Sequence, residues 1–405
     1  SMLLATFSRF SRRCFATSPA SSVVVERSPG MRTVILNRPN ALNSLNLEMV
    51  RVITPLLQKW EKSDTVHCVV LKGAGNKAFC AGGDIRAIFD ERKEEGKAGQ
   101  LAETFFKEEY QLNHLIGTYK KPVVSLIDGI TMGGGVGLSV HGSIRVATET
   151  TLFAMPELGI GFFPDVGGTH FLPRLKGGIG MWLALTGARL KGYSSLQAGV
   201  ATHFVARERL ELALAALSDL CAAKLPITVQ SVADCLKLHD CGDMVVEDEG
   251  ALIDAMGWLF DSARHGASSS AAEMLERILP VLDARAAGEA IPADMEQFPG
   301  QMEAVLTPKL AATYAKSIRG ASPLSLAVTH RAMKHSASSL AANFAIEYGI
   351  SQHFMQGDDF FEGVRALLVE KDNKPAWNPA SLASVPESVV DQYFEPLAPN
   401  KQLKF

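Results

Sequence analysis

The chain has 405 residues, of which 47% are hydrophobic and 20% are charged, and its formal net charge is −3 at pH 7. That length allows a large core and a second packed unit. The near-neutral charge argues against a nucleic-acid surface, and no apolar run approaches the ~18 residues that a membrane span needs. We therefore expect neither DNA nor a membrane as a partner.

Residues 1–22 differ in character from the rest of the chain. Ser1 precedes Met2 and is interpreted as a cloning remnant. The segment is rich in arginine and serine, carries apolar residues at helical spacing, and is followed by its first acid only at Glu26. Such segments are typical of organellar transit peptides, and a frayed tail is the alternative. We predict import into the mitochondrial matrix.

Residues 23–205 alternate between strand-like and helical patterns. The runs "SVVVE", "RTVILN", "HCVVLKG", "PVVSLIDG" and "IRVATE" are rich in β-branched residues and predict strands. Apolar spacing predicts helices near residues 49–60, where Pro55 is expected to introduce a kink, and over residues 101–119. Strands that alternate with helices indicate an α/β core with a buried sheet.

The amino-acid composition of the chain changes after about residue 206. Alanine, leucine and charged residues dominate residues 206–370, and strand-like runs nearly vanish. We predict a helical region there that packs on the α/β core. Residues 371–405 are rich in proline and are expected to form an extended tail.

Glycine clusters punctuate the α/β core in "CAGGDI" (80–85), "TMGGGVG" (131–137) and "DVGG" (165–168). Glycine lets the backbone approach a ligand closely and leaves N–H groups free at a helix start. Two such N–H groups aimed at one point form an oxyanion hole. Taken alone, either of the first two clusters is better explained as a turn.

Several other site types lack their motifs. The sequence has no GxGxxG that opens a helix, no phosphate loop, no CxxC and no HExxH, so we expect no nucleotide cofactor and no metal. The stretch "GLSVHG" (137–142) nearly matches a nucleophile elbow, but His141 stands where the last glycine belongs. A hydrolase with Ser139 as nucleophile is therefore a weak alternative.

Glu157 and Asp165 each follow a proline in the apolar, glycine-rich stretch "MPELGIGFFPDVGG" (155–168). Helix capping explains both: Pro156 suits the first position of a helix, Glu157 complements its dipole, and Asp165 caps the next segment. The alternative is acid–base chemistry beside a bound substrate. Sequence physics alone leaves the two explanations nearly balanced.

A third acid shifts that balance toward chemistry. Glu109 lies on the apolar face of the predicted helix 101–119, while Glu108 points aside. An acid on a buried face is costly unless it is paired or functional. Three acids on surfaces of low polarity can form one site with raised pKa values.

The motifs together carry a family resemblance. "LNRPNALNSL", "FCAGGDI", "ITMGGGVGLSVHG" and "FAMPELGIGFFPDVGG" resemble the crotonase (enoyl-CoA hydratase/isomerase) superfamily. "MPELGIGFFPDVGGTHFLPRL" and the late "DFFEGVRALLVEKDNKPAWNP" are similar to its hydrolase branch. The resemblance runs from about Val23 to the terminal "LKF" and is weakest over 206–320. It implies a spiral of ββα units whose later helices cover the site and could mediate a homo-oligomer.

The resemblance also assigns roles to residues. Gly83 and Gly134 fall where the superfamily places its oxyanion-hole N–H donors. Glu157 falls on the catalytic glutamate, Asp165 on the aspartate of the hydrolase branch, and Glu109 on a glutamate that contacts the substrate. The substrate would be an acyl-CoA thioester, so CoA arrives as part of the substrate and no separate cofactor is implied.

Further positions concern the CoA moiety. Residues 38–41 and 81–85 fall where members of the superfamily line the CoA channel. Lys371 and Lys374 are weaker candidates for phosphate contacts.

One difference from the superfamily pattern limits the type of reaction that the resemblance implies. Hydratases of the superfamily carry a second catalytic glutamate three residues after the oxyanion-hole glycine, where this chain has Gly137. The resemblance therefore implies hydrolysis of a short-chain 3-hydroxyacyl-CoA, first of all 3-hydroxyisobutyryl-CoA of valine catabolism. It leaves open whether Glu157 acts as nucleophile or general base.

Two alternatives to that reaction come from the same superfamily. One is hydration or isomerisation of an enoyl-CoA on the same fold. The other is a structural subunit of the mitochondrial ribosome, which the retained acids and glycine clusters disfavour.

Overall fold

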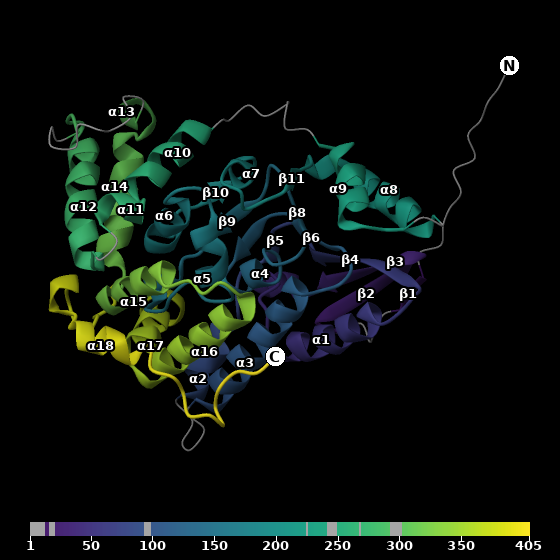
Figure 1. The fold of residues 1–405 in the computed structure, drawn as a ribbon, viewed down its shortest axis with the longest axis horizontal. Helices are drawn as coiled ribbons and strands as arrows, with labels where there is room; N and C mark the ends of the chain where they lie inside the picture. The colour runs from purple at the N-terminus through teal and green to yellow at the C-terminus, as the bar shows by residue number, and fades with distance from the viewer. Residues whose placement is uncertain are drawn as a thin grey trace.

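The structure is a computed structural model that describes residues 13–15, 21–92, 99–223, 226–240, 249–266, 269–291 and 302–405. Most of the expected transit segment, residues 1–22, lies outside the described residues. The chain forms two sheets with helices around them (Figure 1).

The larger sheet has seven strands in the order β1-β2-β3-β4-β6-β8-β11. Strands β1 to β3 pair antiparallel, and the pairs from β3 to β11 are parallel. Parallel neighbours need long crossover connections, which in this chain carry the smaller sheet and the helices. The strands are β1 (Arg13–Phe15), β2 (Val23–Ser28), β3 (Gly30–Leu36), β4 (Val66–Gly73), β6 (Val123–Ile127), β8 (Ile144–Ala147) and β11 (His203–Phe204).

The smaller sheet has four strands in the order β10-β9-β7-β5. Its strands are β5 (Ala78–Cys80), β7 (Ile130–Met132), β9 (Leu152–Ala154) and β10 (Leu190–Lys191). β5, β7 and β9 follow β4, β6 and β8 closely in the chain, and helical segments come after each. This repetition is the expected spiral of ββα units.

Helices cover both faces of the larger sheet. Along β4, Cys68 and Val70 pack in one apolar cluster with α8 and α9, while Val69 and Leu71 pack in the cluster that contains α1 and α3. The helices are α1 (Leu47–Glu61), α3 (Gln100–Gly117), α8 (Leu210–Ala222) and α9 (Val229–Lys237). Pro55 lies inside α1 and does not end it.

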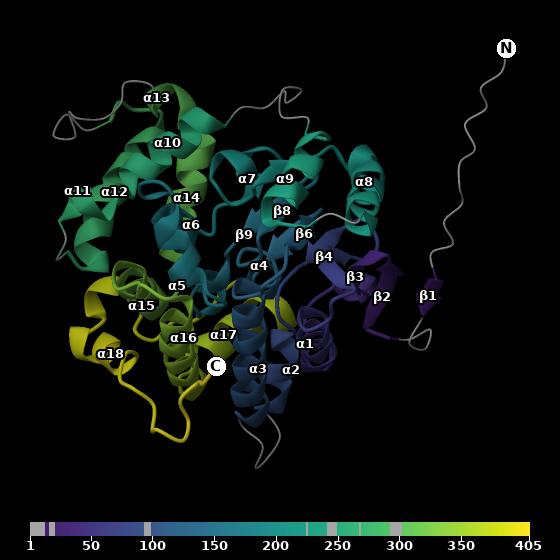
Figure 2. The same ribbon diagram turned by 45° about the vertical axis from the view of Figure 1, so that its right-hand side comes forward.

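The described residues from Leu210 to Val369 are helical apart from their connections, as expected. From α10 onward the helices gather on the side of the molecule away from β1–β3 (Figures 1 and 2). They are α10 (Gly250–Leu259), α11 (Ser262–His265), α12 (Ala271–Ala287), α13 (Met302–Val305), α14 (Pro308–Gly320), α15 (Pro323–Lys334), α16 (Leu340–Gln356) and α17 (Asp359–Val364). α16 packs along α3, which brings the C-terminal region against the core.

The C-terminal tail is not wholly extended. Residues 371–405 contain a 3-10 turn (Leu382–Ser384) and the short helix α18 (Glu387–Gln392), which begins after Pro386. No helix in the described part of the chain is both long enough and apolar enough to cross a bilayer.

Candidate active site

Gly83 lies in an extended segment that follows β5. It forms a parallel bridge with Leu45, in which Leu45 N–H donates to Gly82 O and Asp84 N–H donates to Leu45 O, each at 2.8 Å. Neighbouring residues of an extended segment alternate in direction, so the N–H of Gly83 points away from Leu45.

Gly134 is the first residue of α4 (Gly134–Gly137), so its N–H has no acceptor one turn earlier in the helix. A Cβ added to Gly134 would lie 3.2 Å from Gly83 N and 2.6 Å from Glu109 Oε1. The two predicted oxyanion-hole glycines and Glu109 therefore lie close together.

Glu109 projects from α3 toward these glycines and is only 2% exposed. Its Oε1 has no hydrogen-bond partner among the described residues. Burial, and then the nearby Asp165, raise the pKa of Glu109 well above its usual range. The prediction from the helix face is confirmed.

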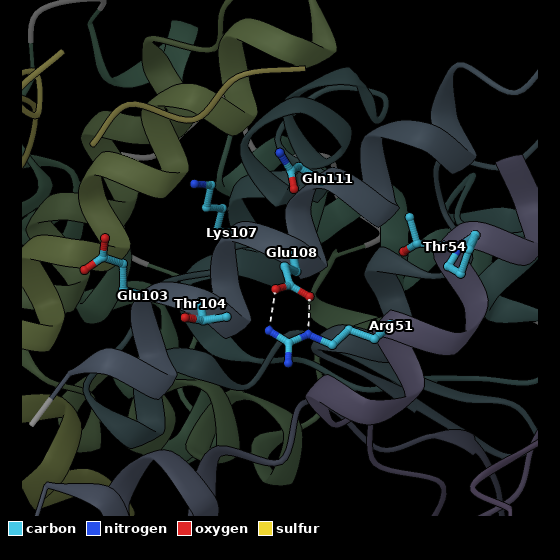
Figure 3. A pocket seen from close by; sticks show the side chains of 8 residues that line it. Arg51, Thr54, Glu103, Thr104, Lys107, Glu108 and Gln111 are labelled. Carbon is cyan, nitrogen blue, oxygen red and sulfur yellow. Dashed lines mark hydrogen bonds and ion pairs between the residues drawn. The ribbon is translucent and has the colours of Figure 1, made fainter. Parts of the chain in front are cut away.

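Glu108 turns the other way, also as predicted. Its carboxylate accepts hydrogen bonds from Arg51 Nε at 2.8 Å and Arg51 Nη2 at 2.7 Å (Figure 3). This ion pair lines a cavity of about 500 Å³ between α1 and α3, which Glu109 does not line.

Glu157 lies in the first turn of a helix, where an acid complements the helix dipole, but its side chain is also buried. It begins a short 3-10 helix (Glu157–Ile160), and Pro156 occupies the cap position before it rather than the first helical position. The side chain is 6% exposed, and its Oε2 is buried without a partner in the part of the chain that the structure describes. A Cβ on Gly133 would lie 3.3 Å from Glu157 Oε1, so the carboxyl group lies beside the start of α4.

Asp165 does not cap the following helix with its side chain. Gly167 stands at the cap position of α5 (Gly168–Phe171), and only the backbone carbonyl of Asp165 accepts a bond there, from Gly168 N–H at 2.8 Å. The carboxylate Oδ2 instead accepts a 2.6 Å hydrogen bond from Tyr110 Oη.

The three acids interact electrostatically. Burial raises the pKa of Asp165 to about 7, although the Tyr110 hydrogen bond acts to lower it. Burial, and then Asp165, raise the pKa of Glu157 well above its usual range, as they do for Glu109. The structure therefore joins Glu109, Glu157 and Asp165 in one low-polarity site, where burial disfavours the charged form of each carboxyl group.

Two buried residues of this region were not predicted. Tyr110 follows Glu109 in α3, and nothing in the sequence indicated its bond to Asp165. Glu347 on α16 is fully buried and accepts hydrogen bonds from Gly167 N–H, Thr169 N–H and Thr169 Oγ1. An acid inside the apolar stretch "NFAIEYGIS" was the signal that could have found it.

Gly137 leaves no room for a second catalytic glutamate. A Cβ on Gly137 would lie 2.6 Å from Asn113 Oδ1 and 2.7 Å from Val166 Cβ. Asn113 is itself fully buried. The pair of glutamates that a hydratase uses is therefore excluded by packing as well as by sequence.

The alternative serine nucleophile is wrong. Ser139 Oγ donates to Gly135 O at 2.9 Å, within its own helical turn. His141 Nε2 instead bonds the backbone carbonyl of Val166 at 2.7 Å. Neither side chain is placed to activate the other.

The two segments expected to line the CoA channel lie together. Ala81 N–H donates to Leu42 O at 3.0 Å, directly after the 3-10 turn Pro39–Ala41, and Arg38 pairs with Asp84 at 2.9 Å. Both segments therefore adjoin Gly83. Lys371 and Lys374 are exposed, and their phosphate contacts stay a prediction.

The spiral of ββα units and the buried pair of glycines beside carboxyl groups define an enzyme of the crotonase class. The chain belongs to the enoyl-CoA hydratase/isomerase family, whose pattern matches residues 31–394. A Danio rerio relative is 45% identical over 384 residues, 94% of this chain and 91% of its own. A Homo sapiens relative is 42% identical over 390 residues, 96% and 92% of the two chains. Both are named 3-hydroxyisobutyryl-CoA hydrolase, mitochondrial.

Solved structures agree with the fold. A carnitinyl-CoA dehydratase from Mycobacterium thermoresistibile superposes with a TM-score of 0.76 at 36% identity, covering 95% of this chain and 99% of its own. An enoyl-CoA hydratase from Rhodobacter sphaeroides gives a TM-score of 0.76 at 32% identity, with 95% and 100% of the chains covered. The predicted crotonase fold is confirmed.

Proposed function

We propose that this chain hydrolyses the thioester of 3-hydroxyisobutyryl-CoA to 3-hydroxyisobutyrate and CoA in the mitochondrial matrix. The proposal rests on one observation. A Cβ added to Gly134 would lie 3.2 Å from Gly83 N and 2.6 Å from Glu109 Oε1, so the two glycines and this acid lie close together. The names of relatives that are 42–46% identical over most of the chain support the substrate and the compartment.

The oxyanion hole supplies the largest rate effect. The thioester carbonyl oxygen accepts from the N–H groups of Gly83 and Gly134, and these bonds strengthen as negative charge develops on that oxygen. Because the site is buried, the same N–H groups act more strongly than they would in water.

Glu157 can cleave the thioester by either of two routes. As general base, it takes a proton from water, the water oxygen bonds to the carbonyl carbon, the C–S bond breaks, and the thiolate of CoA takes up the proton. As nucleophile, its carboxylate attacks the carbonyl carbon and expels the thiolate, and water then hydrolyses the resulting anhydride. The raised pKa of Glu157 makes its ionised form a stronger base in both routes.

The other two acids orient the reactants. Asp165, held by Tyr110, positions Glu157, the water or the substrate hydroxyl. Glu109 forms a hydrogen bond with the 3-hydroxyl group of the substrate, as acceptor or as donor. Burial disfavours the charged form of both carboxyl groups, which favours hydrogen bonding to the substrate and the water over full solvation.

Release of free CoA from a small acyl-CoA panel tests the function. We expect the highest kcat/KM with 3-hydroxyisobutyryl-CoA, a lower one with 3-hydroxypropionyl-CoA, and no hydration of crotonyl-CoA. Hydration of crotonyl-CoA without CoA release would contradict the proposal. Co-sedimentation with ribosomal particles in a protein that releases no CoA would favour the structural alternative.

Single turnover in ¹⁸O-labelled water tests for the anhydride. The label enters a peptide that contains Glu157 only if an anhydride forms and water attacks its enzyme carbonyl, so label in that peptide supports the nucleophilic route. Label confined to the product acid fits the general-base route and also attack of water on the substrate carbonyl of an anhydride.

A further inference from the structure

The peptide group between Val166 and Gly167 is held at both of its polar atoms by ionisable side chains. Val166 O accepts a 2.7 Å hydrogen bond from His141 Nε2, and Gly167 N–H donates to Glu347 Oε2 at 2.6 Å. His141 follows α4 in the chain, whereas Glu347 lies on α16. This peptide group comes directly after Asp165.

The backbone at this point is strained. Val166 has a φ of +54°, a left-handed conformation that is a genuine outlier for a β-branched residue. Gly167 has a φ of +84°, and a Cβ there would lie 2.2 Å from His141 Nε2. Strained backbone persists only where surrounding contacts hold it, and such residues cluster at functional sites.

Glu347 supplies most of these contacts. Its Oε2 accepts from Gly167 N–H, and its Oε1 accepts from Thr169 N–H at 2.8 Å and from Thr169 Oγ1 at 2.6 Å. The side chain is 0% exposed, and burial of a carboxyl group is costly unless its hydrogen bonds repay it. All three bonds go to the one segment that carries Asp165.

We propose that Glu347 is a positioning residue, which fixes the direction of Asp165 by clamping the backbone of residues 166–169. The inference rests on the proposed function, since it gives Asp165 a part in thioester hydrolysis. Asp165 is then held from two sides, by Glu347 through the backbone and by Tyr110 Oη at its carboxylate.

The chemistry of the clamp suggests a specific substitution. Both oxygens of Glu347 accept hydrogen bonds, so in Glu347→Gln the NH₂ group must face either Gly167 N–H or Thr169. The two facing donors repel, the strained turn relaxes, and Asp165 moves. A shift of ~1 Å in a catalytic group costs about 100-fold in rate.

A double-mutant cycle with Asp165→Asn tests the proposal on the full chain, with free-CoA release from 3-hydroxyisobutyryl-CoA as the measurement. We expect Glu347→Gln to lower kcat by about 100-fold with KM changing far less, and to have little further effect in the Asp165→Asn background. Glu347 acts through Asp165, so its effect disappears where Asp165 is already disabled. An equal fall of kcat in both backgrounds, or no fall in either, would overturn the proposal.

Two further variants guard against misfolding. Thr169→Val removes the hydroxyl donor to Glu347, which also reaches Asn343 Oδ1 at 3.4 Å, and we expect a smaller fall in kcat with the same dependence on Asp165. Thr151→Val is the matched control, since Thr151 is also buried, donates to Ile127 O and accepts from Thr148 N–H, and lies between β8 and β9 rather than in the clamp. It should lower the melting temperature with kcat nearly unchanged. If the unmodified chain released no CoA, the proposed function itself would fail, which this set distinguishes from failure of the clamp.

Discussion

Tyr110 Oη donates a 2.6 Å hydrogen bond to Asp165 Oδ2, and both side chains are buried. Tyr110 neighbours Glu109 in α3, so one helix supplies an acid to the site and a donor to a second acid. The bond favours the ionised form of Asp165, and it opposes the burial that raises the pKa of this carboxyl group to about 7.

Removal of that donor should therefore move the pH dependence of the reaction. In Tyr110→Phe the pKa of Asp165 rises further, so more of it is protonated at neutral pH. We expect the acidic limb of the kcat profile to shift to higher pH, with activity partly recovered in alkaline buffer. Tyr119→Phe is the matched control, because among the described residues Tyr119 Oη donates only to the backbone carbonyl of Leu57. An unshifted limb in Tyr110→Phe would count against a role for ionised Asp165.

Loss of either central acid should abolish most of the turnover. We expect Glu157→Gln and Asp165→Asn each to lower kcat by at least ~100-fold, within the range that a positioned acid–base group contributes. Circular dichroism should show an intact fold in both. Normal turnover combined with early melting would mean that the two residues serve only the structure.

The ionisation of Asp165 should lower the free energy of unfolding as the pH rises. The pKa of Asp165 is 3.8 in its ordinary state and about 7 in the folded chain, so between these values the folded state binds more protons. The free energy of unfolding therefore falls as pH rises through this window, and the contribution of Asp165 is fully present only below its unfolded pKa.

Thermal melts across this pH window test whether the free energy of unfolding falls as the pH rises. Asp165→Asn cannot ionise, so we expect it to melt above the unmodified chain at about pH 8 and level with it near pH 4. A variant that melts lower at both pH values would show that Asp165 stabilises the fold instead.

Residues that are close in sequence made most of the site predictable. The stretch of residues 155–168 holds both central acids, and the two glycine clusters lie at strand ends, where parallel strands bring their loops to one edge. Glu109 was predictable because helical periodicity alone places it on the apolar face of α3.

Contacts between distant segments were not predictable in this way. Glu347 meets Gly167 across 180 residues, and Tyr110 meets Asp165 across 55, so only the packing of α16 and α3 brings them together. The capping interpretation of Asp165 failed for a related reason. Local rules fix which residues suit a helix start, whereas tertiary packing turned the Asp165 carboxylate toward Tyr110. Glu157 does stand in the first turn of a 3-10 helix, as that interpretation expected, but its carboxyl group is also buried beside the start of α4.

A methyl group in the oxyanion hole should stop the reaction without unfolding the chain. In Gly134→Ala the added Cβ would lie 2.6 Å from Glu109 Oε1 and 3.2 Å from Gly83 N, where the thioester oxygen must sit. We expect kcat to fall by about 10²–10³, as for the loss of one oxyanion donor. In the control Gly320→Ala, the new Cβ meets nothing within 4 Å, so activity should be unchanged. Comparable activity in the two variants would place the oxyanion hole elsewhere.

Restoring the second glutamate of a hydratase should not restore hydration. In Gly137→Glu the Cβ would lie 2.6 Å from Asn113 Oδ1 and 2.7 Å from Val166 Cβ, both in packed surroundings. Overpacking of this kind typically costs about 1–3 kcal/mol and displaces the neighbours, here the residue that follows Asp165. We expect a lower melting temperature, a loss of CoA release, and no change in the ultraviolet absorbance of crotonyl-CoA. Measurable hydration by this variant would mean that Gly137 alone separates the two reactions, and that the packing of Asn113 and Val166 plays no part in the choice.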